Sequence, residues 1–203
     1  MNVIIDKWFA NPVWEIALDL DTSELISYSY NLKDQNPGVS KSNKGGWHSP
    51  NLFGNEMNNL VAPPNVYLKL LDQINEALII VHESMGLKIS TPSYATESWI
   101  MINHPNSYNL RHLHPRSVFS GVYYLQVPEG DCGDIILYRE NTMLSYLPPH
   151  IVEDWNDMTG STATYKAKQG TLLIFPSWME HSVTPNFTQK DRISISFNTN
   201  YNF

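Results

Sequence analysis

The stretch Arg192-Ile193-Ser194-Ile195-Ser196-Phe197-Asn198 alternates strictly between polar and apolar side chains. Residues that are two apart in an extended chain point to the same face of a sheet, so this stretch has one apolar and one polar face. The apolar face carries Ile193, Ile195 and Phe197, and the polar face carries Arg192, Ser194, Ser196 and Asn198. The pattern predicts a half-buried strand whose polar face begins with an arginine.

Several segments before this one are rich in β-branched and aromatic residues and are bounded by turn residues, as is typical of strands. They cover residues 97–103, 117–127, 134–138, 163–167 and 171–175, and residues 3–18 suggest one or two more strands interrupted at Asn11-Pro12. Seven or eight short strands of this kind predict a β-sandwich or barrel.

Two helices are expected in the first half of the chain. Residues 22–34 follow a polar run that can cap a helix, and residues 65–85 carry an apolar stripe followed by Gly86, where a C-cap glycine belongs. The chain contains no repeat and no strong boundary. We therefore expect one domain, in which residues 1–94 supply a strand and supporting helices and residues 95–203 form the β core.

The composition narrows the class of function. The chain has 203 residues, a formal net charge of −7 and a single cysteine, Cys132. The negative charge argues against a nucleic-acid partner, which would require a basic face, and one cysteine allows no internal disulfide. The N-terminus lacks a signal-peptide pattern, and no apolar run approaches the about 20 residues of a membrane helix. These features favour a cytoplasmic protein without nucleic-acid or membrane partners.

Three histidines form a candidate metal site. His112 and His114 are two apart, so in an extended segment both rings point to the same side. His181 follows the apolar run 171–175 and a Pro-Ser-Trp bend, which places it at the end of a buried strand. Imidazoles that converge from strand ends can hold a metal and leave coordination positions open.

Arg192 is the candidate anion-binding residue. An arginine that points into a barrel needs an anionic partner, which can be a protein carboxylate or the carboxylate of a bound ligand. Ser194 lies on the same strand face and could add a hydroxyl donor. A guanidinium group pairs well with a carboxylate because its planar donors match the two oxygens.

These motifs together resemble the 2-oxoglutarate- and Fe(II)-dependent oxygenases, in the order His-x-His, strand, His, Arg-x-Ser. The similarity is greatest to a group of these oxygenases found in bacteria and in phages of marine bacteria. The segments that carry it are 112–115, 120–125, 175–178, 181–183 and 192–198. The resemblance covers about residues 97–200, with looser support from Gly45-Gly46-Trp47-His48-Ser49.

The resemblance implies a double-stranded β-helix core, which is the jelly-roll fold of the cupins. It implies Fe(II) and 2-oxoglutarate as cofactors, with His112 and His181 as metal ligands and Arg192 with Ser194 on the distal carboxylate of 2-oxoglutarate. Dioxygen and a small-molecule substrate would complete the reaction, which is expected to hydroxylate a small molecule or an amino-acid residue. A homodimer formed through the helices is compatible with the resemblance.

One residue departs from the family pattern. Relatives usually carry a carboxylate two residues after the first histidine, where this chain has His114. Either His114 is the third ligand or a carboxylate from elsewhere serves. Our first choice is His114 and our second is Asp134; Glu180 adjoins His181 and should point the other way in an extended segment.

Two further residues are candidates for cofactor binding. Only one of Tyr123 and Tyr124 can face inward, and Tyr123 is our choice for a phenol that donates to the oxo acid; aromatic packing is the structural alternative. Asn103 ends a predicted strand and could contact the ligand.

Two other functions remain open at this point. One is a three-histidine dioxygenase of cupin type that does not use 2-oxoglutarate, in which Arg192 would grip a substrate carboxylate. The other is a non-catalytic jelly-roll module that binds a metal or nothing, because the same fold hosts all of these activities.

Overall fold

The computed structural model describes residues 3–4, 10–57, 60–139, 152–153 and 155–201. The predicted strand region 3–18 therefore lies partly outside the described residues, and its described part contains one strand, β1 (Trp14–Ala17). Within the described ranges, none of the helices combines the length and the apolar character that a membrane-spanning segment requires.

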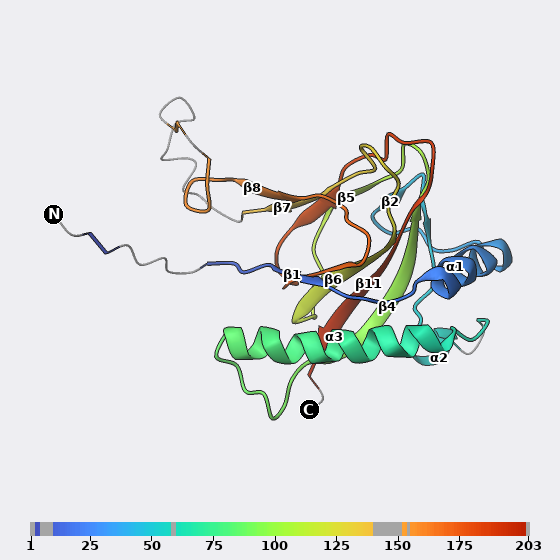
Figure 1. The fold of residues 1–203 in the computed structure, drawn as a ribbon, viewed down its shortest axis with the longest axis horizontal. Coiled ribbons are helices and arrows are strands. Elements are labelled where there is room, and N and C mark those ends of the chain that lie inside the picture. Colours follow the sequence, from blue (N-terminus) through green and yellow to red (C-terminus); the bar gives the residue numbers. More distant parts are fainter. Residues whose placement is uncertain (1–2, 5–9, 58–59, 140–151, 154, 202–203) are drawn as a thin grey trace.

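Two antiparallel sheets face one another (Figure 1). The six-stranded sheet has the order β1, β9 (Thr171–Pro176), β6 (Phe119–Gln126), β11 (Arg192–Asn200), β4 (Tyr94–Asn103) and β3 (Trp47–His48). The five-stranded sheet has the order β2 (Asn43–Lys44), β5 (Tyr108–His112), β10 (His181–Val183), β7 (Ile135–Tyr138) and β8 (Thr162–Tyr165). This is the jelly-roll arrangement that the family resemblance implies.

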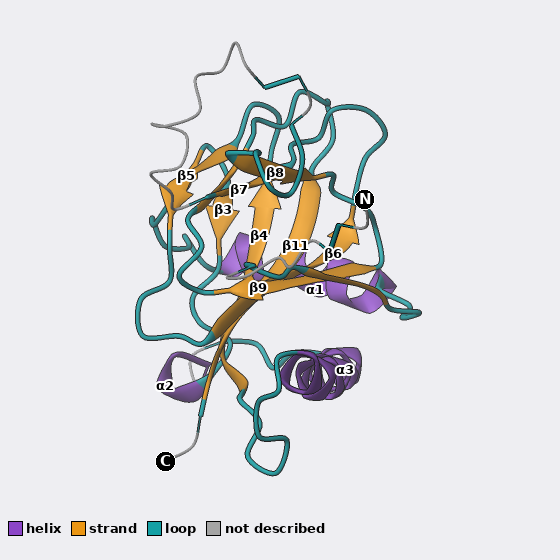
Figure 2. Cartoon of the chain, turned by 90° about the vertical axis from the view of Figure 1, so that its left-hand side faces the viewer, coloured by secondary structure: helices purple, strands orange, loops and turns teal. Residues whose placement is uncertain are grey.

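The helices cover the outer face of the six-stranded sheet, on the side away from the five-stranded sheet (Figure 2). They are α1 (Ser23–Gln35), the short α2 (Gly54–Met57) and α3 (Asn65–Ser84). The stripe on α3 is buried as predicted, with Leu70, Ile74 and Leu78 fully covered. Gly86 has a φ of 67°, the left-handed conformation that ends a helix at little cost for glycine.

The apolar face of β11 packs against these helices. Ile193, Ile195 and Phe197 belong to the large apolar cluster that includes buried residues of α1 and α3. The polar face of the same strand points into the space between the sheets. A second, smaller apolar cluster lies in that space, formed by Val122, Tyr124, Ile135, Leu137, Leu173 and Phe175. The alternation in residues 192–198 therefore separates the helix-covered core from the interior of the jelly roll.

Four short strands were not predicted from the sequence. They are β2, β3, β5 and β10, which have 2, 2, 5 and 3 residues. Short polar strands carry little periodic signal, so pairing with a neighbour decides whether they form. Two of them matter for the site, because β5 ends at His112 and β10 begins at His181.

Candidate active site

A cavity of about 700 Å³ lies between the two sheets. The six-stranded sheet contributes residues from β4, β6 and β11, the five-stranded sheet contributes residues from β5 and β10, and the segment 39–51 closes one side. All four polar-face residues predicted on β11 line it: Arg192, Ser194, Ser196 and Asn198.

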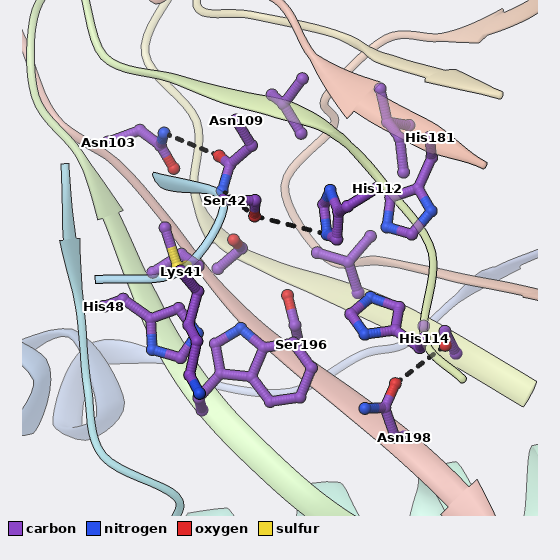
Figure 3. Close-up of a pocket in the computed structure, with 18 of the residues that line it drawn as sticks. Lys41, Ser42, His48, Asn103, Asn109, His112, His114, His181, Ser196 and Asn198 are labelled. Atoms are coloured by element: carbon purple, nitrogen blue, oxygen red, sulfur yellow. Dashed lines mark hydrogen bonds between the residues drawn. The ribbon is translucent and has the colours of Figure 1, made fainter. Parts of the chain in front are cut away.

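The structure brings the three predicted histidines together on one wall of this cavity (Figure 3). One ring nitrogen from each of His112, His114 and His181 lies within 4.8 Å of the others. The ring centroids of His112 and His181 are 4.3 Å apart, and the ring centroid of His114 lies 5.0 Å from that of His112 and 5.1 Å from that of His181.

Local pairing explains this convergence. His112 and His181 are direct partners in the antiparallel pair of β5 and β10, so their side chains point to the same face. His114 lies beyond the end of β5, and its backbone N–H donates to the carbonyl of Ser177 at 3.2 Å. The Ser177 hydroxyl in turn donates to the carbonyl of Ser117. These bonds hold the loop after β5 against the segment that leads to His181.

Backbone carbonyls orient two of the rings. The Nδ1 atoms of His112 and His181 lie 2.7 Å from the Leu110 carbonyl and 3.0 Å from the Met179 carbonyl. A carbonyl only accepts, so each Nδ1 carries the proton and each Nε2 keeps its lone pair for a metal. Ser42 Oγ is 3.4 Å from His112 Nε2 and is the nearest competing donor.

Burial keeps these imidazoles neutral. It lowers the pKa of His114 to about 3 and that of His181 to about 4, and the neighbouring histidines add to both decreases. Burial also lowers the pKa of His112. A neutral imidazole is the form that binds a metal, so the histidines are ready for coordination.

The two candidate carboxylates lie elsewhere. Glu180 pairs with Arg111, and the Arg111 guanidinium lies 4.1 Å from the centre of the Tyr138 ring. Asp134 is three residues before Leu137, the cross-strand partner of His181, which corresponds to about 10 Å along a strand. Among the described residues, the metal-binding group contains the three histidines and neither acid.

Arg192 lies at the other end of the cavity and is 3% exposed. Its Nη1 donates to the carbonyls of Cys132 and Gly133 at 3.2 Å and 2.5 Å, whereas its Nε has no partner among the described residues. No carboxylate within the described ranges forms an ion pair with it. Burial lowers the pKa of this guanidinium group. A buried cation without an acidic partner indicates a site for an anionic ligand.

Asn103 and Ser194 line the cavity together with Arg192. Asn103 is the direct partner of Arg192 in the pairing of β4 and β11, and both side chains line the cavity. Its Nδ2 donates to Asn109 at 3.3 Å, and its buried Oδ1 has no partner within the described residues. Ser194 is 4% exposed and lies two residues along the same face.

The structure does not bring Tyr123 to the cavity. Tyr123 is fully buried in the cluster beneath the helices, and Tyr124 lines the cavity instead, as the cross-strand partner of Ser194. Burial raises the pKa of Tyr124 to about 12, so its phenol keeps its proton. The sequence could not separate the two tyrosines, because β6 is buried on both faces and has no alternation to read.

The site fits Fe(II) and 2-oxoglutarate on its own geometry. Three neutral imidazoles at 4.8 Å or less are suitable ligands for a divalent iron. The unpaired guanidinium of Arg192 and the unpartnered oxygen of Asn103 are buried polar groups that a bound dicarboxylate and its associated water can satisfy.

Comparison with known proteins identifies the family and the fold. Residues 97–198 match the model of the family described as "Putative 2OG-Fe(II) oxygenase". A prolyl-4-hydroxylase from Pseudomonas putida is similar in structure, with a TM-score of 0.61, 14% identity and coverage of 95% of this chain and 94% of that chain. A prolyl hydroxylase from Trichoplax adhaerens, solved with a peptide of hypoxia inducible factor, has a TM-score of 0.60, 16% identity and coverage of 93% and 83%.

HygX from Streptomyces hygroscopicus, solved with nickel and 2-oxoglutarate bound, has a TM-score of 0.59, 12% identity and coverage of 96% of this chain and 84% of that chain. At these identities the likeness to solved structures shows the double-stranded β-helix fold. No curated protein matches the sequence significantly.

Proposed function

Because this chain belongs to the 2OG-Fe(II) oxygenase family, we propose that His112, His114 and His181 bind its iron and that Arg192 binds the distal carboxylate of 2-oxoglutarate. The observation that carries this assignment is the pairing, in one cavity, of three converging neutral imidazoles with a buried arginine that has no acidic partner among the described residues.

When bound, iron and 2-oxoglutarate would supply the oxidising chemistry: dioxygen would convert 2-oxoglutarate to succinate and carbon dioxide, and its second oxygen atom would enter the substrate. The remaining tasks belong to the protein. Three neutral histidines add no negative charge to the metal, so the charge of the dicarboxylate is balanced by the metal and by Arg192.

Donors around the arginine orient the ligand. Ser194 and Tyr124 face each other across β11 and β6, and each offers a hydroxyl to the carboxylate that Arg192 binds. Val122, Ile135 and Phe175 of the smaller apolar cluster line the same cavity, and the Phe175 ring lies 4.9 Å from that of His181. A low-polarity surrounding strengthens each charged hydrogen bond to the ligand.

We propose hydroxylation as the outcome, on a small molecule or an amino-acid residue. The prolyl hydroxylases among the similar structures support this choice. The single buried cysteine, Cys132, is compatible with the cytoplasm, where we propose that the protein acts. A homodimer remains the oligomeric state that we would test first, by sedimentation.

The test is a pair of measurements on the purified protein. Without oxygen, Fe(II) and 2-oxoglutarate together should produce a visible charge-transfer absorption band, and His181→Ala should abolish it. Under air, the loaded protein should release succinate slowly even without substrate. If iron stabilises the protein against heat but 2-oxoglutarate adds no band, no further stabilisation and no succinate, the cofactor assignment is wrong.

A further inference from the structure

The cavity extends beyond the histidines, away from Arg192. Four cross-strand pairs of β4 and β11 line it in succession: Asn103–Arg192, Met101–Ser194, Trp99–Ser196 and Glu97–Asn198. Successive pairs are two residues apart, which corresponds to about 7 Å, so the first and the last are separated by about 20 Å. Figure 3 shows Asn103 and Asn198 at opposite ends of the pocket, with Ser196 between them.

The position of the metal site divides this row. The Trp99 ring lies 5.7 Å from the ring of His114, so the Trp99–Ser196 pair is level with the histidines. The Asn103–Arg192 pair is the end assigned to 2-oxoglutarate. The Glu97–Asn198 pair is about 7 Å further on, at the end that 2-oxoglutarate does not use. A substrate that presents a C–H bond to the metal can therefore extend along Trp99 towards Glu97.

Glu97 is held in place at this end. Its Oε2 accepts a hydrogen bond from Asn198 Nδ2 at 2.8 Å, and Asn198 Oδ1 accepts one from Ser120 Oγ at 2.8 Å. Asn198 and Ser120 are 4% and 1% exposed, whereas Glu97 lies at the exposed rim. Two buried residues thus fix the direction of one accessible carboxylate.

No cation of the described chain neutralises this carboxylate. Four charged residues line the cavity: Lys41, Glu97, Arg111 and Arg192. Arg192 lies at the far end, and Arg111 is paired with Glu180. Glu97 is the only acid in the cavity lining among the described residues, and it forms no ion pair there. The cavity end beyond the histidines therefore carries a negative charge, the Glu97 carboxylate, in a fixed orientation.

An aromatic wall stands beside this carboxylate. Trp99 lies two residues from Glu97 on the same strand face, and His48 stacks on it with ring centroids 5.4 Å apart and planes 5° apart. The indole offers apolar surface to a carbon chain and a negative π face to a cation. An ammonium group at Glu97 would gain from both neighbours.

We propose that Glu97, Asn198 and Trp99 form a substrate subsite for a protonated amine, an inference that rests on the proposed function. The carbon that is oxidised would lie level with His114, about 7 Å from the amine nitrogen. Lys41, from the segment before β2, lies beside His48 (Figure 3) and forms no ion pair within the described residues. A substrate that also carries a carboxylate can place it there, so amino acids are the first amines to test.

The experiment measures succinate release by the protein loaded with Fe(II) and 2-oxoglutarate under air. The probes are lysine and arginine, which are long enough to place a carbon close to the required distance of about 7 Å from a nitrogen, compared with glutarate and butanol. We expect amines to raise the rate above the substrate-free level, and glutarate and butanol to leave it unchanged. Stimulation by the acid or the alcohol without stimulation by any amine, or no stimulation by any of the amines, overturns the subsite.

The matched variants are Glu97→Gln and Glu76→Gln, since Glu76 is an exposed residue on α3 far from the cavity lining. Loss of a charged hydrogen bond typically changes an equilibrium by about ten- to a hundredfold. Glu97→Gln should raise the KM for the stimulating amine by that factor without changing the Kd for 2-oxoglutarate in the absorption titration, and Glu76→Gln should change neither. An unchanged KM for the amine in Glu97→Gln refutes the subsite. If Fe(II) and 2-oxoglutarate produce no absorption band in the unmodified protein, the proposed function is refuted instead.

Discussion

Replacing Arg192 with methionine should separate ligand binding from folding in this protein. The guanidinium group is 3% exposed and has two carbonyl partners but no acidic partner among the described residues. A dicarboxylate that reaches it forms two charged hydrogen bonds, each worth about 1.5–3 kcal/mol. Their loss amounts to at least about 3 kcal/mol, so Arg192→Met should raise the Kd for 2-oxoglutarate by at least about a hundredfold.

The ligand-free protein should respond differently. Methionine fills much of the same volume and removes a buried cation, which relieves a desolvation penalty of several kcal/mol. It also leaves the carbonyls of Cys132 and Gly133 without a donor, at a cost of about 1–3 kcal/mol each. The two effects oppose each other, so the free energy of unfolding without ligand should change by no more than about 2 kcal/mol.

The assay combines two titrations on the same samples. Anaerobic absorption with Fe(II) present gives the Kd for 2-oxoglutarate, and urea unfolding without ligand gives the stability. Arg116→Met is the control, because Arg116 is an exposed arginine outside the cavity lining. The assignment of Arg192 would be refuted by a variant that folds and binds Fe(II) but keeps the native affinity for 2-oxoglutarate.

Three further predictions concern the same cavity. His114→Ala should lower the affinity for Fe(II) by more than the about 10- to 100-fold that is typical of residues that only hydrogen-bond to a metal ligand. His114→Asp should restore most of the affinity, and Asp134→Ala should leave it unchanged. An equal loss of affinity in Asp134→Ala would make that acid the third ligand. Tyr124→Phe should weaken 2-oxoglutarate binding by about tenfold and Tyr123→Phe should not, because only the first phenol faces the cavity; the opposite result would restore Tyr123 as the donor. In the metal-free folded protein, the pKa of His114 is about 3 and that of His181 is about 4, against a usual value of 6.5 in the unfolded chain. Because the unfolded chain binds protons first, the free energy of unfolding should fall as the pH drops from about 6.5 to about 4 and should be constant above about 6.5. A urea midpoint that stays the same across that interval would contradict the burial of these rings.

Much of the fold could be predicted from local pattern. The alternation over 192–198 placed Ile193, Ile195 and Phe197 on the face that the helices cover, and the stripe on residues 65–85 placed Leu70, Ile74 and Leu78 beneath α3. Such patterns are readable because one face of each element is buried and the other is not. The short strands β5 and β10 were missed because their formation depends on pairing with each other.

The candidate site divides in the same way. The sequence by itself determined the residue types and their order: two histidines, a third after the strand 171–175, and an arginine followed by a serine on a polar strand face. It also placed Arg192 and Ser194 on one side, since that side follows from alternation alone.

Only the tertiary structure decided which of these residues meet. The register of β10 against β5 sets His181 beside His112, and the loop after β5 adds His114 while Asp134 lies elsewhere. The register of β6 against β11 turns Tyr124 to the cavity and Tyr123 to the core, and that of β4 sets Glu97 beside Asn198. Register is a long-range property: a shift of one residue turns every side chain to the other face, and a strand buried on both faces carries no local signal to choose between them.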